Sequence, residues 1–319
     1  MSDSIIDIIA SYLGITPNEV KQLSLNAHKT YKRYFIPKKK GGQRAIFHPS
    51  KQTKALQYAF IETALSKLPV HQASAAYIRG VKSPLLINAT KHSSYPYSVR
   101  IDFKDFFPSI VPSDLIKIIN DAGILSKIAA EDEEFISSSL FVKYPDGNIG
   151  LAIGAPSSPN ISNIVMFSLD EKISTLAMSI YPESIYTRYA DDIFFSSNKI
   201  GACKDFAIKI EAILKNIYSP NLKINRKKTT FTSRGTKRVV TGLYICPDGQ
   251  VSIGRRNKRY IKKLIFDYKN NSIGKKEKGY LSGYLSFILD VEPDFFNRLV
   301  LKYGAELVSR AHAGNPTKR

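Results

Sequence analysis

The sequence predicts an α+β protein whose C-terminal part is helical. Three observations lead to this fold class. Four segments carry apolar residues at helical spacing, namely 5–13, 54–68, 156–177 and 206–217. Short apolar or alternating runs typical of strands lie between them. The pattern after Arg255 is helical to the end, and no internal repeat interrupts the chain. A mixed α+β core followed by a helical tail is therefore expected.

The predicted strands form two isolated segments and two hairpins. The isolated strands are 45–47 and 97–103. In the first hairpin, runs 185–189 and 193–197 are separated by Ala190, Asp191 and Asp192, which predicts an acidic turn. In the second hairpin, runs 238–245 and 250–253 are joined by Cys-Pro-Asp-Gly. Pro156 opens the third helical segment, as proline often does at a first helical turn.

Length and charge restrict the function. The 319 residues exceed the usual size of a single core, so two or three packed units are expected. Lys and Arg number 47 against 27 Asp and Glu, which leaves a formal charge of +20. This excess requires a polyanionic partner, and nucleic acid fits it better than a membrane surface because the basic residues follow no amphipathic stripe.

The positive charge is concentrated in two blocks. Residues 20–61 contain ten Lys or Arg and no acid, including the run Lys38, Lys39 and Lys40. Residues 223–278 contain seventeen Lys or Arg against three acids, interleaved with aromatic residues. The stretch between them is nearly balanced. A solvated surface is the commoner role of one charge run, but two basic arms around an acidic centre suit an enzyme that grips phosphates and places metal ions.

Targeting and cysteine patterns indicate a cytoplasmic protein with no membrane partner. No apolar run reaches the roughly 18 residues of a spanning helix, and the first residues carry acids where a signal peptide would carry Lys or Arg. Cys203 and Cys246 form no C-x-x-C motif, and the five His are scattered. Neither a disulfide framework nor a zinc site is expected.

Three aspartates are the candidate catalytic and metal-binding residues. An Asp-Asp pair is ordinarily a solvated turn, but Asp191 and Asp192 lie between apolar strands, where like charges require cations. Asp102 lies at the end of an apolar strand, where burying its charge costs free energy unless the carboxylate binds a partner. If that strand pairs beside the hairpin, the three carboxylates can hold two Mg²⁺ ions, with Mn²⁺ as a possible substitute, for in-line nucleotidyl transfer.

These motifs resemble those of reverse transcriptases. Asp102 with Phe107, then Gly154-Ala155-Pro156-Ser157-Ser158-Pro159, then Tyr189-Ala190-Asp191-Asp192 occur in the family's order and spacing. The resemblance implies a right-hand polymerase fold with fingers, palm and helical thumb. Residues 1–94 would form the N-terminal helices and fingers, 95–250 the palm with a fingers insertion around 112–150, and 251–319 the thumb. It also implies an RNA-directed DNA polymerase that uses the three aspartates as metal ligands.

The resemblance also assigns nucleotide-binding residues. Phe107 matches the aromatic residue that stacks on the sugar and excludes a ribose 2′-hydroxyl, so the substrates would be dNTPs. Arg44, assisted by Lys40, occupies the fingers position that binds the triphosphate, and Lys228 the position near the leaving pyrophosphate. Ile153, just before Gly154, replaces the family's usual Gln, whose amide lies against the incoming nucleotide. The polar contact of that amide would therefore be lost.

Two shorter motifs resemble those of the retron subfamily. They are Asn88-Ala89-Thr90-Lys91-His92 and Val240-Thr241-Gly242-Leu243. A lone histidine is more often structural, and a strand glycine more often marks a bulge, but together they favour a retron enzyme. The resemblance implies synthesis from a guanosine 2′-hydroxyl of a cognate non-coding RNA, a branched RNA-DNA product (msDNA) and an effector partner in anti-phage defence. The predicted RNA-binding residues are Asn88, His92, Val240, Thr241, Gly242, Arg255, Arg256, Lys258, Arg259, Lys262 and Lys263.

Two alternatives remain open at the level of sequence. A group II intron-like, diversity-generating or other standalone defence reverse transcriptase would share the polymerase motifs. The expected absence of maturase and endonuclease regions argues against the first of these, and the two shorter motifs argue against the others. A non-catalytic RNA-binding scaffold would keep the same fold. The presence of all three aspartates argues against a scaffold, and Ile153 keeps that alternative open.

Overall fold

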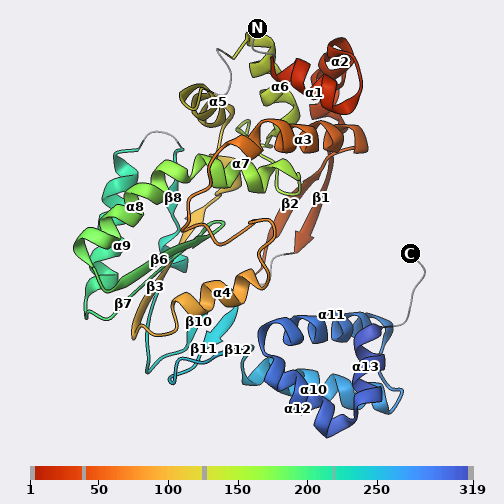
Figure 1. Ribbon diagram of the computed structural model, residues 1–319, viewed down its shortest axis with the longest axis vertical. Coiled ribbons are helices and arrows are strands. Elements are labelled where there is room, and N and C mark those ends of the chain that lie inside the picture. The colour runs from red at the N-terminus through yellow and green to blue at the C-terminus, as the bar shows by residue number, and fades with distance from the viewer. Residues whose placement is uncertain (1–3, 38–40, 124–127, 218–219, 315–319) are drawn as a thin grey trace.

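The computed structural model describes residues 4–37, 41–123, 128–217 and 220–314 (Figure 1). Its helices are α1 (Ile5–Leu13), α2 (Pro17–Ala27), α3 (Lys51–Thr63), α4 (Pro84–Lys91), α5 (Pro112–Asp121), α6 (Ala130–Leu140), α7 (Ser157–Val165), α8 (Phe167–Ile180), α9 (Ala202–Lys215), α10 (Arg255–Lys269), α11 (Lys275–Val291), α12 (Pro293–Tyr303) and α13 (Ala305–Ala313). Short 3₁₀ turns are η1 (His28–Thr30), η2 (Leu65–Lys67), η3 (Phe107–Ser109) and η4 (Arg226–Lys228).

In the described ranges the strands form four sheets. They are β1 (Lys32–Pro37), β2 (Gln43–His48), β3 (Tyr97–Lys104), β4 (Phe141–Lys143), β5 (Ile149–Leu151), β6 (Ser184–Tyr189), β7 (Asp192–Ser197), β8 (Lys223–Ile224), β9 (Thr230–Ser233), β10 (Arg238–Val240), β11 (Leu243–Ile245) and β12 (Val251–Ser252). The central sheet has the order β6-β7-β3-β8, and β9 also pairs with β3. The mixture of helices and strands confirms the predicted α+β class.

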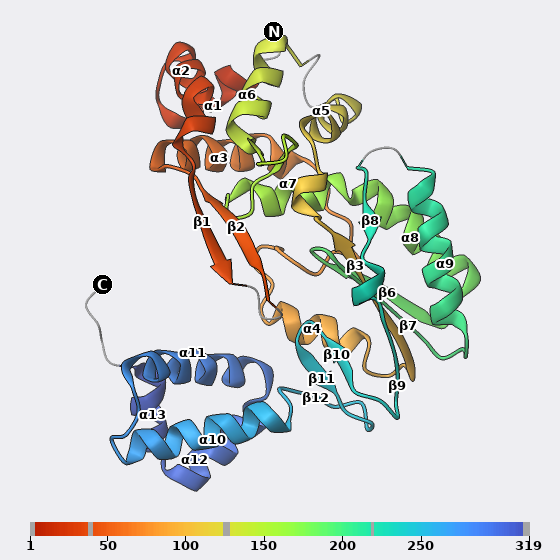
Figure 2. The same cartoon turned by 180° about the vertical axis from the view of Figure 1, so that it is seen from behind.

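The central sheet separates an apolar face from a polar one. Because side chains alternate along a strand, Val99, Ile101 and Phe103 of β3 point to one face, whereas Arg100 and Asp102 point to the other. The apolar face packs on helices α8 and α9, as Figures 1 and 2 show from opposite sides. The polar face is partly covered by α4. The sheet therefore buries one side in the core and turns its carboxylates to the other.

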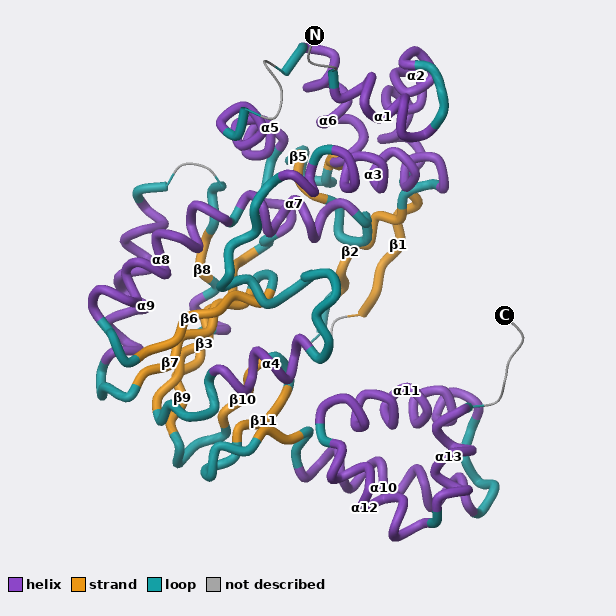
Figure 3. Tube along the Cα trace, viewed as in Figure 1, coloured by secondary structure: helices purple, strands orange, loops and turns teal. Residues whose placement is uncertain are grey.

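Two large hydrophobic clusters organise the chain. The first joins the N-terminal helices α1 and α3, together with α6, to the central sheet and to helices α7 to α9. The second joins helices α10 to α12 to α4 and to the sheet β10-β11-β12. Figure 3 shows the C-terminal helices as a separate group that follows these strands. The predicted boundary at residue 250 therefore falls inside the second cluster, and the predicted division into fingers, palm and thumb stays a prediction.

Most predicted elements are present, and three differ. Segment 54–68 is α3, which begins earlier because Ser50 caps it by accepting from the amide of Thr53, followed by η2. Segment 156–177 is two helices, α7 and α8, because the backbone at Met166 has a ψ of −8°. Run 238–245 is two strands, because Thr241 and Gly242 have φ of 48° and 83° and turn the chain into a hairpin.

Candidate active site

The strand register brings the predicted carboxylates to one end of the central sheet. Asp102 of β3 lies directly opposite Asp192 of β7. Tyr189 pairs with Asp192, so only Ala190 and Asp191 form the turn between β6 and β7. The Phe103 amide donates to the carbonyl of Asp191 at 3.0 Å. Asp102 and Asp192 therefore occupy facing positions on two paired strands, and Asp191 lies next to them in the turn.

Two cations pair with two of the three carboxylates in the structure. The Lys228 ammonium, in η4, lies 2.9 Å and 3.0 Å from the two carboxylate oxygens of Asp102, which is almost fully buried. Arg100 forms a bidentate pair with Asp192, with bonds of 2.9 Å and 2.7 Å. Both cations are exposed on their outer side, so they can move away when another cation arrives.

Burial disfavours the charged form of the aspartates in the turn. It raises the pKa of Asp191 above its usual value, and the nearby charge of Asp102 acts in the same direction. It also raises the pKa of Asp192 to about 6, although Arg100 opposes the shift. The carboxylates are thus arranged so that an added cation would stabilise their charged forms, as expected of a site that binds metal ions.

The donor chemistry fits divalent ions such as Mg²⁺, although the side chains are not closed around such an ion. Carboxylates are the oxygen ligands that Mg²⁺ prefers. Within the described ranges, no group of three His, Cys, Asp or Glu side chains is disposed to hold a metal. Asp102 and Asp192 instead face Lys228 and Arg100. Metal binding at this site would therefore require both cations to be displaced.

A buried polar network lies beneath the turn. Arg188 of β6 is fully buried and forms a bidentate pair with Asp170 of α8. The same guanidinium donates to the carbonyl of Ala190 at 3.2 Å and to the side chain of Asn163. Tyr186 donates to Asp170 at 2.6 Å. Ala190 has a φ of 54°, which non-glycine residues rarely adopt, so the network helps to fix a strained turn.

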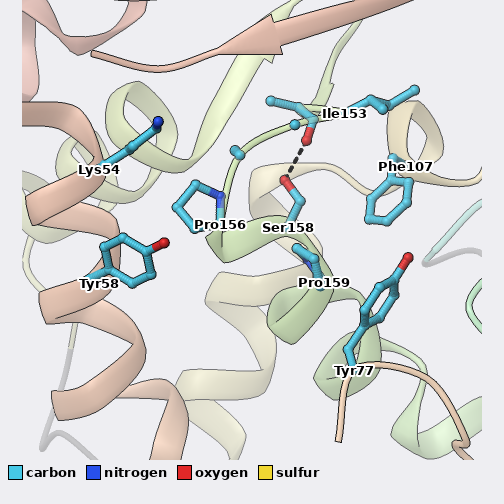
Figure 4. Close-up of a pocket in the computed structure, with 11 residues that line it drawn as sticks. Lys54, Tyr58, Tyr77, Phe107, Ile153, Pro156, Ser158 and Pro159 are labelled. Carbon is cyan, nitrogen blue, oxygen red and sulfur yellow. Dashed lines mark hydrogen bonds between the residues drawn. The ribbon is translucent and has the colours of Figure 1, made fainter. Parts of the chain in front are cut away.

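The predicted sugar-binding residue lies in a pocket beside the aspartates. Phe107, in η3, lines a cavity of about 400 Å³ together with Ile153, Gly154 and Tyr77 (Figure 4). The carbonyl of Ile153 accepts from the Phe47 amide at 2.8 Å, which links the pocket to β2. A Cβ on Gly154, whose φ is 112°, would lie 2.9 Å from Ile46 and 3.0 Å from the Phe47 carbonyl. The close approach of β2 thus requires glycine here.

The fingers residues are only partly described. Arg44 is exposed on β2, directly opposite Ile36 of β1. The pairing places Tyr34, Ile36, Arg44 and Ile46 on one face of this hairpin. The Ile46 side chain packs close to Gly154, one of the pocket residues, so this face is turned toward the pocket. Lys40 lies outside the described residues.

The Asn88 and His92 motif is internal. Both side chains are fully buried, so neither is accessible to RNA in this structure, and we do not propose a direct RNA contact for them. His92 bonds Ser196 and Thr187, each at 2.8 Å, and ties α4 to the polar face of the sheet. Burial lowers its pKa to about 3, so the ring is neutral at physiological pH.

The second retron-like motif joins α4 to the following sheet. Val240 is buried, and the Thr241 hydroxyl donates to the Leu85 carbonyl at 2.9 Å. Gly242 completes the turn. These contacts give Val240 and Thr241 a structural role, whereas their predicted contact with RNA stays untested.

The predicted thumb residues share one helix. All six lie on α10, whose buried side consists of Ile261, Leu264 and Ile265. Arg255, Arg256, Arg259, Lys262 and Lys263 are exposed. Lys258 instead pairs with Glu292, which also accepts from the Ser252 hydroxyl and the Ile253 amide, each at 3.2 Å. Lys258 thus anchors the helix, Lys263 pairs with Asp267 at 3.1 Å, and the other four present positive charge to solvent.

Sequence reasoning missed three residues of the site. Arg100 lies two positions before Asp102, so strand alternation alone would have placed it on the same face. Arg188 lies within an apolar strand, and the local sequence does not indicate that Asp170 is its partner. Tyr77 lies in a segment with no regular structure, and only the fold brings it to the pocket.

Carboxylates that face each other at the end of two central strands, beside an aromatic pocket and a cationic hairpin, define a nucleotidyl-transferring polymerase site of the right-hand class. The family model of reverse transcriptases (RNA-dependent DNA polymerases) matches residues 36–274. The chain belongs to this family, and it is an RNA-directed DNA polymerase. Enzymes of this family generally use divalent metal ions.

Curated relatives cover most of the chain. The retron Ec83 reverse transcriptase of Escherichia coli is 34% identical over 87% of this chain and 88% of its own length. The retron Ec73 enzyme of the same organism is 36% identical over 86% and 88%. The retron Ec86 enzyme is 31% identical over 93% and 90%. The predicted resemblance to retron reverse transcriptases is therefore confirmed.

Solved structures are more distant. Apo telomerase from Candida Tropicalis, truncated from its C-terminal domain, is 18% identical with a TM-score of 0.45, over 75% of this chain and 60% of its own. Telomerase from Candida albicans with a TWJ fragment of telomeric RNA is 13% identical with a TM-score of 0.47, over 90% of this chain and 61% of its own.

In the part of the chain that the structure describes, no helix is long and apolar enough to cross a membrane.

Proposed function

We propose that this chain is the polymerase of a retron that copies a cognate structured RNA into msDNA. Synthesis would begin at the 2′-hydroxyl of a guanosine in that RNA, use dNTPs and leave a branched RNA-DNA molecule. The observation that supports it most is the relation to retron reverse transcriptases over nearly nine tenths of the chain, with all three aspartates at one end of the central sheet. A cytoplasmic location, an effector protein and a role in anti-phage defence belong to the same proposal.

Each group of side chains has a separate role in the proposed reaction. Asp102, Asp191 and Asp192 would hold Mg²⁺, which would lower the pKa of the attacking hydroxyl and neutralise the triphosphate. Phe107 packs on the sugar and excludes a 2′-hydroxyl from the nucleotide. Arg44 approaches the triphosphate from the hairpin. Lys228, released from Asp102, meets the leaving pyrophosphate.

The RNA would lie against the exposed cations of α10. Arg255, Arg256 and Arg259 present charges in the first turns of the helix, where they would contact phosphates rather than base edges. Phosphate contacts recognise the shape of a stem-loop rather than its sequence. The Lys258 pair with Glu292 would hold α10 in place for this contact.

The test is to purify the chain from cells carrying its native locus and to digest the bound nucleic acid separately with ribonuclease, deoxyribonuclease and debranching enzyme. We expect a small DNA joined to RNA through a debranchable 2′,5′ linkage. It should be absent from the Asp191→Ala, Asp192→Ala variant, which should still bind RNA. Unbranched DNA would support another reverse transcriptase reaction, and RNA without DNA would support a non-catalytic scaffold.

A further inference from the structure

Among the described residues that line the pocket, Tyr77 is the polar aromatic residue on the Phe107 side, and the prediction of nucleotide-binding residues did not include it. It lies between η2 and α4, is 43% exposed, and lines the pocket with Phe107, Ile153 and Gly154. In Figure 4 its ring stands below Phe107, with the hydroxyl pointing toward that residue. Lys54 and Tyr58 of α3 lie across the pocket.

The backbone of Tyr77 is strained. Its φ is 63°, a region in which a bulky residue is an energetically costly outlier. Such strain persists only where the surrounding structure fixes it, and it is found most often at functional sites. The conformation therefore needs neighbours that hold the segment before Tyr77.

The segment before Tyr77 is held from two sides. The Ala75 amide donates to the Arg188 carbonyl at 2.7 Å, and the Arg188 amide donates to the Ala73 carbonyl at 2.8 Å. From α7, the Asn163 amide group donates to the Ala76 carbonyl at 2.8 Å. Arg188 also bonds the turn that carries Asp191. One set of buried bonds thus positions both Tyr77 and the catalytic turn.

The pocket offers few other polar side chains near Phe107. Ile153, Pro156 and Pro159 are apolar, and the Ser158 hydroxyl already donates to the Ala152 carbonyl at 2.7 Å. Burial raises the pKa of Tyr77, and the Asp191 carboxylate acts in the same direction. The phenol therefore stays protonated at neutral pH and can donate a hydrogen bond. It lies close enough to the catalytic turn to interact electrostatically with Asp191.

We propose that Tyr77 contacts the incoming deoxynucleotide beside Phe107, and that its hydroxyl supplies the polar contact that the aliphatic side chain of Ile153 cannot make. This inference rests on the proposed function and adds to it a residue that determines nucleotide affinity. It also gives a reason for the strained backbone, because the Tyr77 ring lines the pocket in this conformation.

The test compares single-nucleotide incorporation on a primed RNA template by the wild-type chain and by Tyr77→Phe. Loss of one neutral hydrogen bond should raise the KM for the dNTP about five- to tenfold, with kcat and the thermal midpoint nearly unchanged because the ring is kept. Tyr12→Phe, on the exposed side of α1, is the matched control and should leave KM unchanged. Adding Ile153→Gln to Tyr77→Phe should restore much of the affinity.

An unchanged KM in Tyr77→Phe would overturn the inference, and so would equal increases in both phenylalanine variants. Equilibrium binding of the same dNTP, measured alongside, separates this inference from the proposed function. A wild-type chain that binds the nucleotide but incorporates none would contradict the proposed function. In that case the Kd for the dNTP would still test Tyr77. A Kd about five- to tenfold higher in Tyr77→Phe than in the wild-type chain would support the contact, and an equal Kd would overturn it.

Discussion

A neutral histidine couples the stability of this protein to pH. His92 is buried between Ser196 and Thr187, and burial lowers its pKa to about 3 from an ordinary value near 6.5. Lys91 and Arg238 add repulsion against its charged form. Between these two pKa values the unfolded chain binds a proton that the folded chain does not. The stabilising contribution is therefore complete above the unfolded pKa and is lost as pH falls.

We expect the free energy of unfolding to fall by about 2 kcal/mol more in the wild-type chain than in His92→Gln between roughly pH 7.5 and pH 5. Urea denaturation at several pH values measures the difference. Parallel curves for the two proteins would show that His92 titrates in the folded state as it does in the unfolded one, contrary to this account.

Glycine at position 150 is required by a close backbone contact. A Cβ there would lie 2.3 Å from the Pro108 carbonyl oxygen, next to the turn that carries Phe107. Backbone cannot move away as cheaply as a flexible side chain. By contrast, a Cβ on Gly279, within α11, would meet nothing within 4 Å.

Gly150→Ala should destabilise the protein by at least about 2 kcal/mol, because overpacking displaces backbone. Gly279→Ala is the matched control and should stabilise it by about 0.5 to 1 kcal/mol, because alanine favours the helix. Thermal and chemical unfolding measure both. Equal effects of the two substitutions would contradict the contact at Pro108.

At the scale of elements, the hairpin β6-β7 depends on α8 through a buried ion pair. Breaking the pair between Arg188 and Asp170 by Arg188→Met should cost about 3 to 5 kcal/mol, since it leaves a buried carboxylate without its cation. Replacing the whole group by Asp170→Leu, Tyr186→Phe and Arg188→Met removes every charge and the Tyr186 hydroxyl that bonds Asp170. That triple variant should recover most of the stability.

Polymerase activity should not recover with stability in the triple variant. The Ala190 carbonyl loses its donor, so the turn that carries Asp191 is less well fixed. We expect kcat at least tenfold below wild type and a higher Mg²⁺ requirement, measured by extension of a primed RNA template. Full activity in a stable triple variant would show that the network only supports folding.

The sequence predicted local elements better than the contacts between them. Strands β3, β6 and β7 followed from apolar runs, and the hairpin of β6 and β7 followed from its acidic turn. The pairing of β3 beside this hairpin was a condition of the predicted metal site, and the structure shows it. The burial of Asn88 and His92 depends on how α4 docks on the sheet, which no local pattern encodes. The pair of Arg188 with Asp170 could not be predicted for the same reason, because the two residues belong to different elements that meet only when the chain folds.

At the scale of the whole molecule, the excess of 47 basic over 27 acidic residues predicts strongly salt-dependent RNA binding. Not every cation should contribute. Lys228 and Arg100 face carboxylates, and Lys258 faces Glu292. The exposed arginines of α10 lie on the helix that we propose contacts RNA. Charge removed there should weaken RNA binding more than the same charge removed from α9, behind the sheet.

We expect the triple variant Arg255→Ala, Arg256→Ala, Arg259→Ala to reduce the slope of log Kd against log salt by about 2 to 3, because each phosphate contact contributes about 0.7 to 0.9. Lys199→Ala, Lys204→Ala, Lys215→Ala removes equal charge from exposed positions around α9 and should leave the slope almost unchanged. Filter binding of the cognate RNA at several salt concentrations measures both slopes. Equal slopes in the two variants would mean that net charge, and not the surface of α10, determines RNA affinity.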